Sequence, residues 1–176
     1  MKTKILALAV LLSTSMVASL AQARGSASGV MVLANAFIYN STDEDNGTKV
    51  ESKNSIYDIK LGYLTGSGLY LGGLYTIRNS ETGGSSSDGK ALGGSVGYVG
   101  ANGFFVMGHY IASAELGDNL KEGKGIQGDF GYITNVTGAF VVGVELTYRS
   151  IEYKKTDDSK YKKDELMPML TVGFVF

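Results

Sequence analysis

The sequence lacks cysteine altogether, has one proline, and carries no long run of apolar residues beyond its N-terminal segment. The absence of cysteine excludes a disulfide framework and a lipoprotein anchor. Without a run long enough to cross a bilayer, the rest of the chain does not fit a helical membrane protein. With 16 basic against 17 acidic residues, the charge is also too balanced to indicate nucleic-acid binding.

The N-terminal segment has the order of a secretory signal peptide. Lys2 and Lys4 give it a positively charged start, residues 5–12 are apolar, and residues 21–23 read Ala-Gln-Ala, which matches a cleavage site. We therefore expect residues 1–23 to be a signal peptide and residues 24–176 to form a single domain.

Glycine and tyrosine are frequent, at 25 and 11 residues, and they recur in a pattern. Gly62-Tyr63, Gly97-Tyr98 and Gly131-Tyr132 follow one another at intervals of about 35 residues, and Gly173-Phe174 is a degenerate fourth copy. Helical tetratricopeptide arrays repeat at a similar length. Helical spacing is absent here, however, and each glycine costs a helix about 1 kcal/mol. Each unit is better interpreted as strand, tight turn, strand and polar loop.

This repeat divides the chain into eight predicted strands, at 29–40, 55–65, 69–79, 91–100, 103–115, 124–135, 138–151 and 165–176. Most have the roughly 9–11 residues that a tilted strand needs to cross a bilayer. Tight turns are expected near 66–68, 100–103 and 135–138, and long polar loops at 41–54, 79–90, 116–123 and 152–164. This alternation of short turns and long loops is typical of transmembrane β-barrels.

Apolar and polar residues alternate along the predicted strands, which separates two faces. The seventh strand shows this best, because the even positions from Phe140 to Tyr148 are apolar and oppose Glu145, Thr147 and Arg149. In the last strand, Leu166, Leu170, Val172 and Phe174 share one apolar face with Phe176. A closing strand of a soluble β-sandwich would explain that segment equally well. The signal peptide and the alternating connections favour a lipid-facing strand. For the first strand, where both faces are apolar, we assign the even positions to lipid.

Aromatic residues on the apolar face gather near the strand ends, as expected for two membrane interfaces. The predicted girdle consists of Tyr57, Tyr63, Tyr75, Tyr98, Phe104, Tyr110, Tyr132, Phe140, Tyr148, Phe174 and Phe176.

In these features the chain resembles the small eight-stranded outer-membrane barrels of the OmpA-domain and OmpX type. The resemblance implies an all-β, antiparallel, up-and-down transmembrane β-barrel in the outer membrane of a bacterial envelope, with both termini in the periplasm. It also implies a monomer surrounded by outer-membrane lipid and lipopolysaccharide. The C-terminal strand would be recognised by the barrel insertion machinery through its terminal aromatic residue.

Eight strands enclose a space that side chains just fill, or that holds one small ligand. The periplasmic half of this lumen is predicted to be apolar, whereas its outer half is polar. We expect a closed lumen with paired charges, and a narrow pore is the alternative. The predicted polar network consists of Asp58, Lys60, Arg78, His109, Glu115, Gln127, Asp129, Glu145 and Arg149.

An enzymatic role would depend on His109, the only histidine. Some eight-stranded barrels remove acyl chains from lipid A with a closely spaced histidine and serine. Here Ser113 is the nearest hydroxyl along the strand, at about 13 Å, which is too far for a hydrogen bond. We therefore predict no catalytic residue, no metal and no cofactor, and a structural or surface-interaction role. A small lipid-modifying enzyme or a ligand carrier using the lumen is the alternative.

Overall fold

The protein is all-β, with eight antiparallel strands arranged in a ring. The computed structural model describes residues 28–45, 48–82, 84–156 and 159–176, so the predicted signal peptide lies outside the described residues. The strands are β1 (Gly29–Asp45), β2 (Thr48–Leu64), β3 (Leu69–Thr82), β4 (Ser85–Val99), β5 (Phe104–Leu116), β6 (Leu120–Thr137), β7 (Phe140–Lys155) and β8 (Lys160–Val175).

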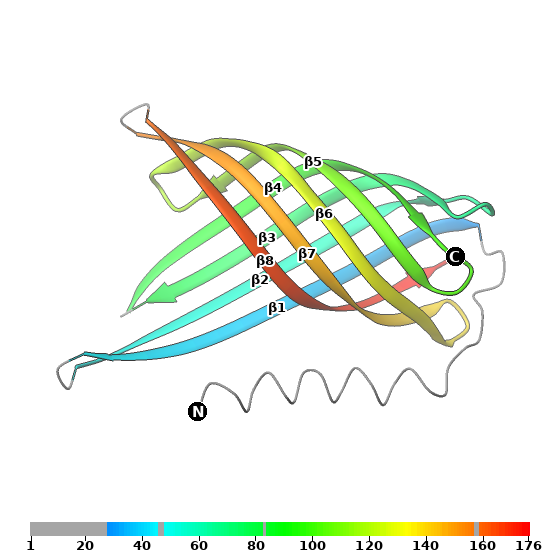
Figure 1. The fold of residues 1–176 in the computed structure, drawn as a ribbon, viewed down its shortest axis with the longest axis horizontal. Helices are drawn as coiled ribbons and strands as arrows, with labels where there is room; N and C mark the ends of the chain where they lie inside the picture. The colour runs from blue at the N-terminus through cyan, green and yellow to red at the C-terminus, as the bar shows by residue number, and fades with distance from the viewer. Residues whose placement is uncertain (1–27, 46–47, 83, 157–158) are drawn as a thin grey trace.

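Each strand pairs with its neighbours in sequence, and β1 also pairs with β8, which closes the barrel (Figure 1). The predicted eight-stranded, antiparallel, up-and-down barrel is therefore confirmed. Among the described residues, no helix combines the length and the apolar character needed to cross a membrane.

Three tight turns join β2 to β3, β4 to β5 and β6 to β7, as predicted. In the second of them Gly103 has a φ of 88°, which favours glycine because a Cβ atom would be strained there. The Gly103 amide donates to the Gly100 carbonyl at 2.9 Å, and the Gly103 carbonyl accepts from Ile133 at 3.0 Å. We call this end of the barrel the turn end and the opposite one the hairpin end.

The connections at the hairpin end differ from the prediction. Segments predicted as long polar loops are largely β-structure, because β1 continues to Asp45, β2 begins at Thr48 and β7 continues to Lys155. Ladder pairs extend along these hairpins as far as Asp45–Thr48 and Lys154–Lys160. Polar residues on both faces obscure the period of two that marks a half-buried strand, so the sequence resembled a loop.

The repeated glycines lie beside large side chains inside the barrel. A Cβ atom on Gly131 would lie 2.5 Å from Phe105 Cζ, and one on Gly97 would lie 2.6 Å from Met107 Cγ. Glycine at these positions therefore makes room for a bulky neighbour on the adjacent strand. The side chains so accommodated fill the turn end with a buried apolar cluster, the turn-end cluster: Met31, Leu33, Leu64, Tyr70, Val99, Phe105, Met107, Ile133, Val141 and Val175.

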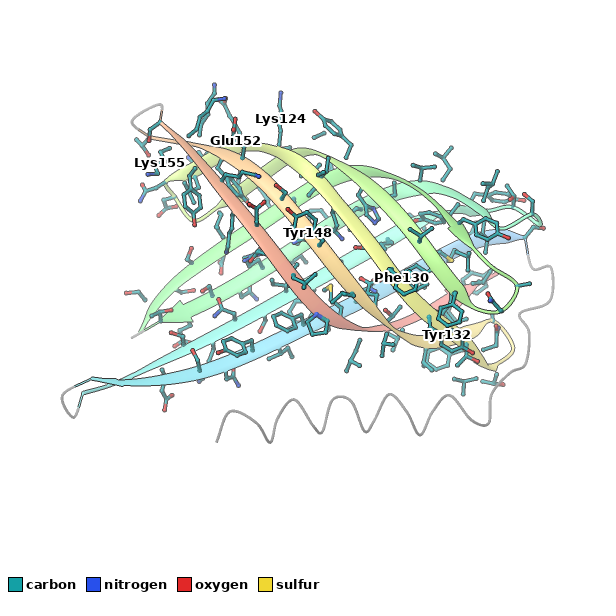
Figure 2. All side chains as sticks on the ribbon, viewed as in Figure 1. Lys124, Phe130, Tyr132, Tyr148, Glu152 and Lys155 are labelled. Carbon is teal, nitrogen blue, oxygen red and sulfur yellow. The ribbon has the colours of Figure 1, made fainter. Side chains whose placement is uncertain are left out.

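The outside of the barrel carries an apolar belt, and its side chains project away from the strands (Figure 2). In β1 the even positions face outward, as predicted, because Ile38 is 61% exposed whereas Met31 and Leu33 are fully buried. Large exposed apolar side chains of the belt include Ile59, Leu61, Leu69, Leu71, Leu92, Val96, Val106, Ile126, Phe130, Val144, Leu146, Leu166, Leu170 and Val172.

The closing ladder between β1 and β8 is short. In the part of the chain that the structure describes, only residues Met31 to Ala36 of β1 pair with β8, opposite Val175 to Leu170. On their other sides, β1 pairs with β2 along its whole length and β8 pairs with β7 from Lys160 to Phe174. The barrel is thus continuous at the turn end and open along one seam toward the hairpin end.

Candidate functional site: the polar network in the lumen

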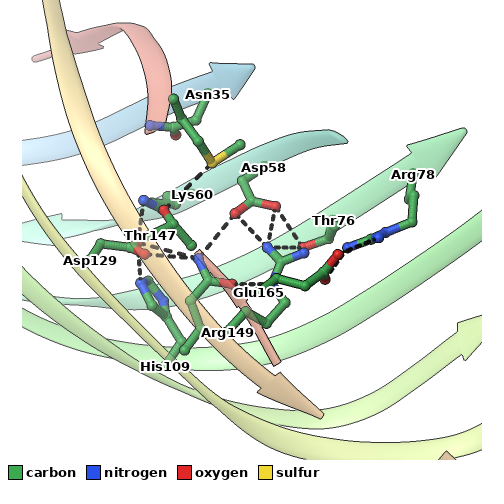
Figure 3. A network of polar contacts seen from close by, with 12 residues as sticks. Asn35, Asp58, Lys60, Thr76, Arg78, His109, Asp129, Thr147, Arg149 and Glu165 are labelled. Carbon is green, nitrogen blue, oxygen red and sulfur yellow. Dashed lines mark hydrogen bonds and ion pairs between the residues drawn. The ribbon is translucent and has the colours of Figure 1, made fainter. Parts of the chain in front are cut away.

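Charged and polar side chains fill the middle of the barrel (Figure 3). They face inward because side chains alternate along each strand, and they come from the six strands β2 to β7. Seven of the predicted network residues lie here with at most 4% of their surface exposed: Asp58, Lys60, His109, Gln127, Asp129, Glu145 and Arg149.

Arg149 joins three strands through one guanidinium group. Its Nη2 donates to both carboxylate oxygens of Asp58, at 2.8 and 2.7 Å, and to Thr76 Oγ1 at 3.2 Å. Its Nε donates to Gln127 Oε1 at 2.7 Å. Thr76 and Gln127 also donate to Asp58, at 2.7 and 3.0 Å. The Asp58 carboxylate is therefore fully surrounded by donors, as a buried charge requires.

Lys60 forms the second centre of the network. Its Nζ donates to Glu145 Oε1 and Oε2 at 2.9 and 2.8 Å, and it also forms an ion pair with Asp129. Thr147 Oγ1 donates to Glu145 at 3.1 Å, and Gln127 Nε2 donates to Asp129 Oδ1 at 3.0 Å. Gln127 thus connects the Lys60 centre to the Arg149 centre, because it contacts both carboxylates, Asp58 and Asp129.

His109 lies between a hydroxyl and a carboxylate. Its Nε2 is 2.7 Å from Asp129 Oδ2, and its Nδ1 is 2.6 Å from Ser95 Oγ. The sequence does not point to Ser95, because this hydroxyl lies on a different strand from His109 and is 14 residues away along the chain. Ser95 lies on β4 directly opposite His109, so only the register between the two strands reveals it.

Arg78 is buried as predicted, but its partner is Glu165 on β8 rather than a member of the central network. Arg78 Nη1 donates to Glu165 Oε1 at 2.7 Å, and the two groups form an ion pair. Lys163 lies 3.2 Å from the same carboxylate. Glu165 is also the register partner of Arg149, so this pair lies directly beside the central network.

The prediction for Glu115 is wrong. Glu115 pairs with Lys90 at 3.2 Å, and about half of its side chain is exposed. The register of β5 against β6 shifts between Ile111 and Ala114, so the inward face passes from odd to even positions. The same shift leaves Ser113 on the exposed face.

Apolar residues bound the network on both sides. On β5 the inward positions run from Met107 through His109 to Ile111, and only His109 is polar. One buried cluster lies on the hairpin side and consists of Ala91, Ile111, Ala114, Ile151 and Tyr153. A second lies beside the network and consists of Ile56, Met167 and Met169, with Phe37 packed against it, and its two methionines pair with Thr147 and Glu145 of β7. The network is thus enclosed within the lumen, where it ties strands together.

Within the described residues, no group of histidine and acidic side chains is arranged to hold a metal ion. Three carboxylates, two cationic side chains and one imidazole contact one another directly, which leaves few oxygens for a further ligand. One buried acceptor near the network, Asn35 Oδ1, has no hydrogen-bond partner, although Asn35 Nδ2 donates to Thr171 at 2.7 Å.

The predicted girdle residues all lie on the outward face. Tyr63, Tyr98, Phe104 and Phe174 are between 44% and 54% exposed near the turn end, and Tyr57, Tyr75, Tyr110 and Tyr148 are between 37% and 59% exposed further toward the hairpins. Phe176 is 69% exposed, and Tyr132 and Phe140 are half-buried. Contacts join several of them, among them Phe104 with Tyr132 and Phe140 with Phe174.

No family model matches the sequence, and no curated protein matches it. Among solved structures, the chain is similar to the translocator domain of the autotransporter NalP from Neisseria meningitidis. The identity is 15%, the match covers 81% of this chain, and the TM-score is 0.37. The chain spans 60% of the length of that domain.

Proposed function

We propose that this protein is an integral β-barrel of the bacterial outer membrane with a structural or surface-interaction role and a closed lumen. The observation that carries the proposal is the inverted distribution of polarity. Leucine, valine and phenylalanine side chains stand exposed around the outside of the ring, whereas Asp58, Lys60 and Arg149 are buried inside. A soluble monomer rarely exposes so large a continuous apolar surface, whereas lipid covers it without cost.

The resemblance to the OmpA-domain and OmpX type supports the finer parts of this proposal. Residues 1–23 would be cleaved on secretion, the monomer would be bounded by outer-membrane lipid and lipopolysaccharide, and the C-terminal strand would be recognised by the insertion machinery. The β-hairpins at the hairpin end would then project from the cell surface. Exposed hairpins on a rigid scaffold are the usual place for specific contacts.

A charge on the belt tests the membrane location. Val144 lies midway along the apolar outward positions of β7, which run from Phe140 to Tyr148, and is 50% exposed. In lipid, Val144→Arg should lower the free energy of unfolding by about 2–4 kcal/mol. Ser86→Arg, at an exposed position on the β4 hairpin, is the matched control and should change it little. Equal, small effects of the two substitutions would show that the belt does not face lipid.

The closed lumen is tested by conductance. Tyr70, Phe105 and Met107 are at most 2% exposed in the turn-end cluster, and such close packing supports a lumen without a continuous path for water. The purified protein in a planar bilayer should therefore give no steady single-channel steps. Reproducible steps of fixed size would establish the alternative, a narrow pore.

One observation favours a second candidate, a lipid-modifying hydrolase. Ser95, His109 and Asp129 form a chain of hydroxyl, imidazole and carboxylate, which is the order of a nucleophile, a base and an orienting acid. Against this role, Ser95 is only 5% exposed, and Asp129 is also bound to Lys60 and Gln127. We therefore assign these three residues to the structural network.

A further inference from the structure

The closing ladder between β1 and β8 ends beside Pro168, the only proline of the chain. The last pair of the closing ladder is Ala36–Leu170, so Pro168 would be the next residue of β8 to face β1. The amide of Phe176 donates to Val30 of β1, whereas that of Val175 donates to Ala139 on the β7 side. Along an antiparallel strand, successive N–H groups point alternately to the two neighbouring strands. The even-numbered residues of β8 therefore direct their nitrogen atoms toward β1, as Phe176 does, and Pro168 is one of them. It has no hydrogen to donate, so the ladder stops there.

Beyond Pro168 the two strands separate. In Figure 1 the outer parts of β1 and β8 diverge, β8 toward the upper left and β1 toward the lower left, and within the described residues no pair joins them there. Each of them is still held on its other side, by β2 or by β7. The hairpin half of the barrel therefore has two strand edges with no ladder between them in the described residues, and side chains such as Phe37, Met167 and Met169 lie between them.

Along this unpaired part of the seam, some lumen-facing positions of β1 carry exposed side chains. Odd positions of β1 face the lumen, yet Tyr39 is 53% exposed and Phe37 is half-buried. Phe37 packs against Ile56, Met167 and Met169. On the outward side, Ile38 and Leu166 are 61% and 64% exposed on either side of the seam. An apolar surface thus runs from the outside of the belt, through the seam, to the inner wall.

We propose that this seam is a lateral binding site for an acyl chain of the surrounding membrane lipid. The proposal rests on the proposed membrane location, which puts the seam at the level of the outer lipid layer. The apolar surface suits a hydrocarbon chain, and methionine side chains such as Met167 and Met169 adapt to its shape. The free backbone groups of both edges need hydrogen-bond partners in lipid, and the ester and hydroxyl groups at the head of a lipid supply them.

The test uses single tryptophans, because the chain contains none. The full-length protein is reconstituted into vesicles of phosphatidylcholine with brominated acyl chains, which quench nearby tryptophan fluorescence. Phe37→Trp reports on the seam. Phe105→Trp is the internal control, since Phe105 is buried behind continuous ladders. Leu71→Trp, at a position 71% exposed on the belt, is the lipid-facing control.

If the seam admits an acyl chain, Phe37→Trp is quenched to nearly the same degree as Leu71→Trp, and Phe105→Trp is quenched much less. Adding Pro168→Val restores an amide hydrogen that can extend the ladder to Ile38, so the quenching of Phe37→Trp should fall toward that of Phe105→Trp. Quenching of Phe37→Trp no stronger than that of Phe105→Trp overturns the seam proposal, as does quenching by aqueous iodide alone. Loss of quenching at Leu71→Trp instead overturns the membrane location.

Discussion

Lys60 and Glu145 form an ion pair with Nζ 2.8 Å from Oε2, and both side chains are completely buried. Replacing both partners of a buried ion pair by apolar side chains of similar size often changes the free energy of unfolding little. Removing only one partner leaves a buried charge without compensation and is strongly destabilising. Lys60→Met should therefore lower the free energy of unfolding by about 3–5 kcal/mol. Urea unfolding in lipid vesicles measures this loss.

The double variant Lys60→Met, Glu145→Leu is the control for this prediction. It removes both charges and leaves Asp129 with His109 and Gln127, so most of the lost stability should return. A double variant as unstable as Lys60→Met would show that the lysine contributes through its packing rather than through its charge.

A methyl group on Gly131 should be costly, because its Cβ would lie 2.5 Å from both Phe105 Cζ and the Val144 carbonyl oxygen. The backbone atom cannot move without disturbing the β6–β7 ladder. We expect Gly131→Ala to destabilise the barrel by about 1–3 kcal/mol through overpacking. Gly128→Ala, on the same strand with nothing within 4 Å of its Cβ, is the matched control and should be nearly neutral in the same unfolding measurement.

The Arg78–Glu165 pair should contribute measurably to stability, because both side chains are largely buried. Glu165→Gln removes the negative charge and leaves the Arg78 guanidinium without its ionic partner. A hydrogen bond to a charged group contributes about 1.5–3 kcal/mol, so the free energy of unfolding should fall by about that amount. Urea unfolding in lipid vesicles measures the loss.

Glu115→Gln serves as the comparison for Glu165→Gln. Glu115 pairs with Lys90 at an exposed position, where solvent screens the interaction, so this substitution should lower the free energy of unfolding by less than about 1 kcal/mol. An equal loss for the two substitutions would show that burial adds nothing to the Arg78–Glu165 pair.

Expression of the protein should leave lipid A unchanged, because Ser95 and His109 are enclosed in the lumen. Mass spectrometry of lipid A from cells with and without the protein checks this expectation. Loss of an acyl chain that depends on both His109 and Ser95, in variants that still fold, would establish the hydrolase instead.

The barrel itself was predictable, because the alternation of apolar and polar residues is strong wherever one face meets the lumen and the other the outside. Tyr63 and Lys60 could be placed on opposite faces from this alternation alone. Glu115 could not, since the shift after Ile111 is a property of the pairing with β6 and leaves no mark in the sequence of β5.

Two other features needed the structure for different reasons. Ser95 lies between Gly94 and Gly97 in a glycine-rich strand, where alternation is weak and no signal marks an inward hydroxyl. The hairpin extensions are polar on both faces, so their composition resembles that of a loop. In both cases the missing information was the register between strands, which contacts distant in sequence determine.

The short β1–β8 ladder also bears on how the barrel folds. It joins Met31 to Val175, residues at opposite ends of the described chain, so its formation closes the longest loop in the molecule. Loop-closure entropy disfavours such a contact until the other strands are in place. Seven hairpin contacts between sequence neighbours can therefore assemble first, and the ring should close in the last step. With few pairs to hold it, this ladder should also be the first to open, and its amides should exchange hydrogen fastest among the ladders of the apolar belt.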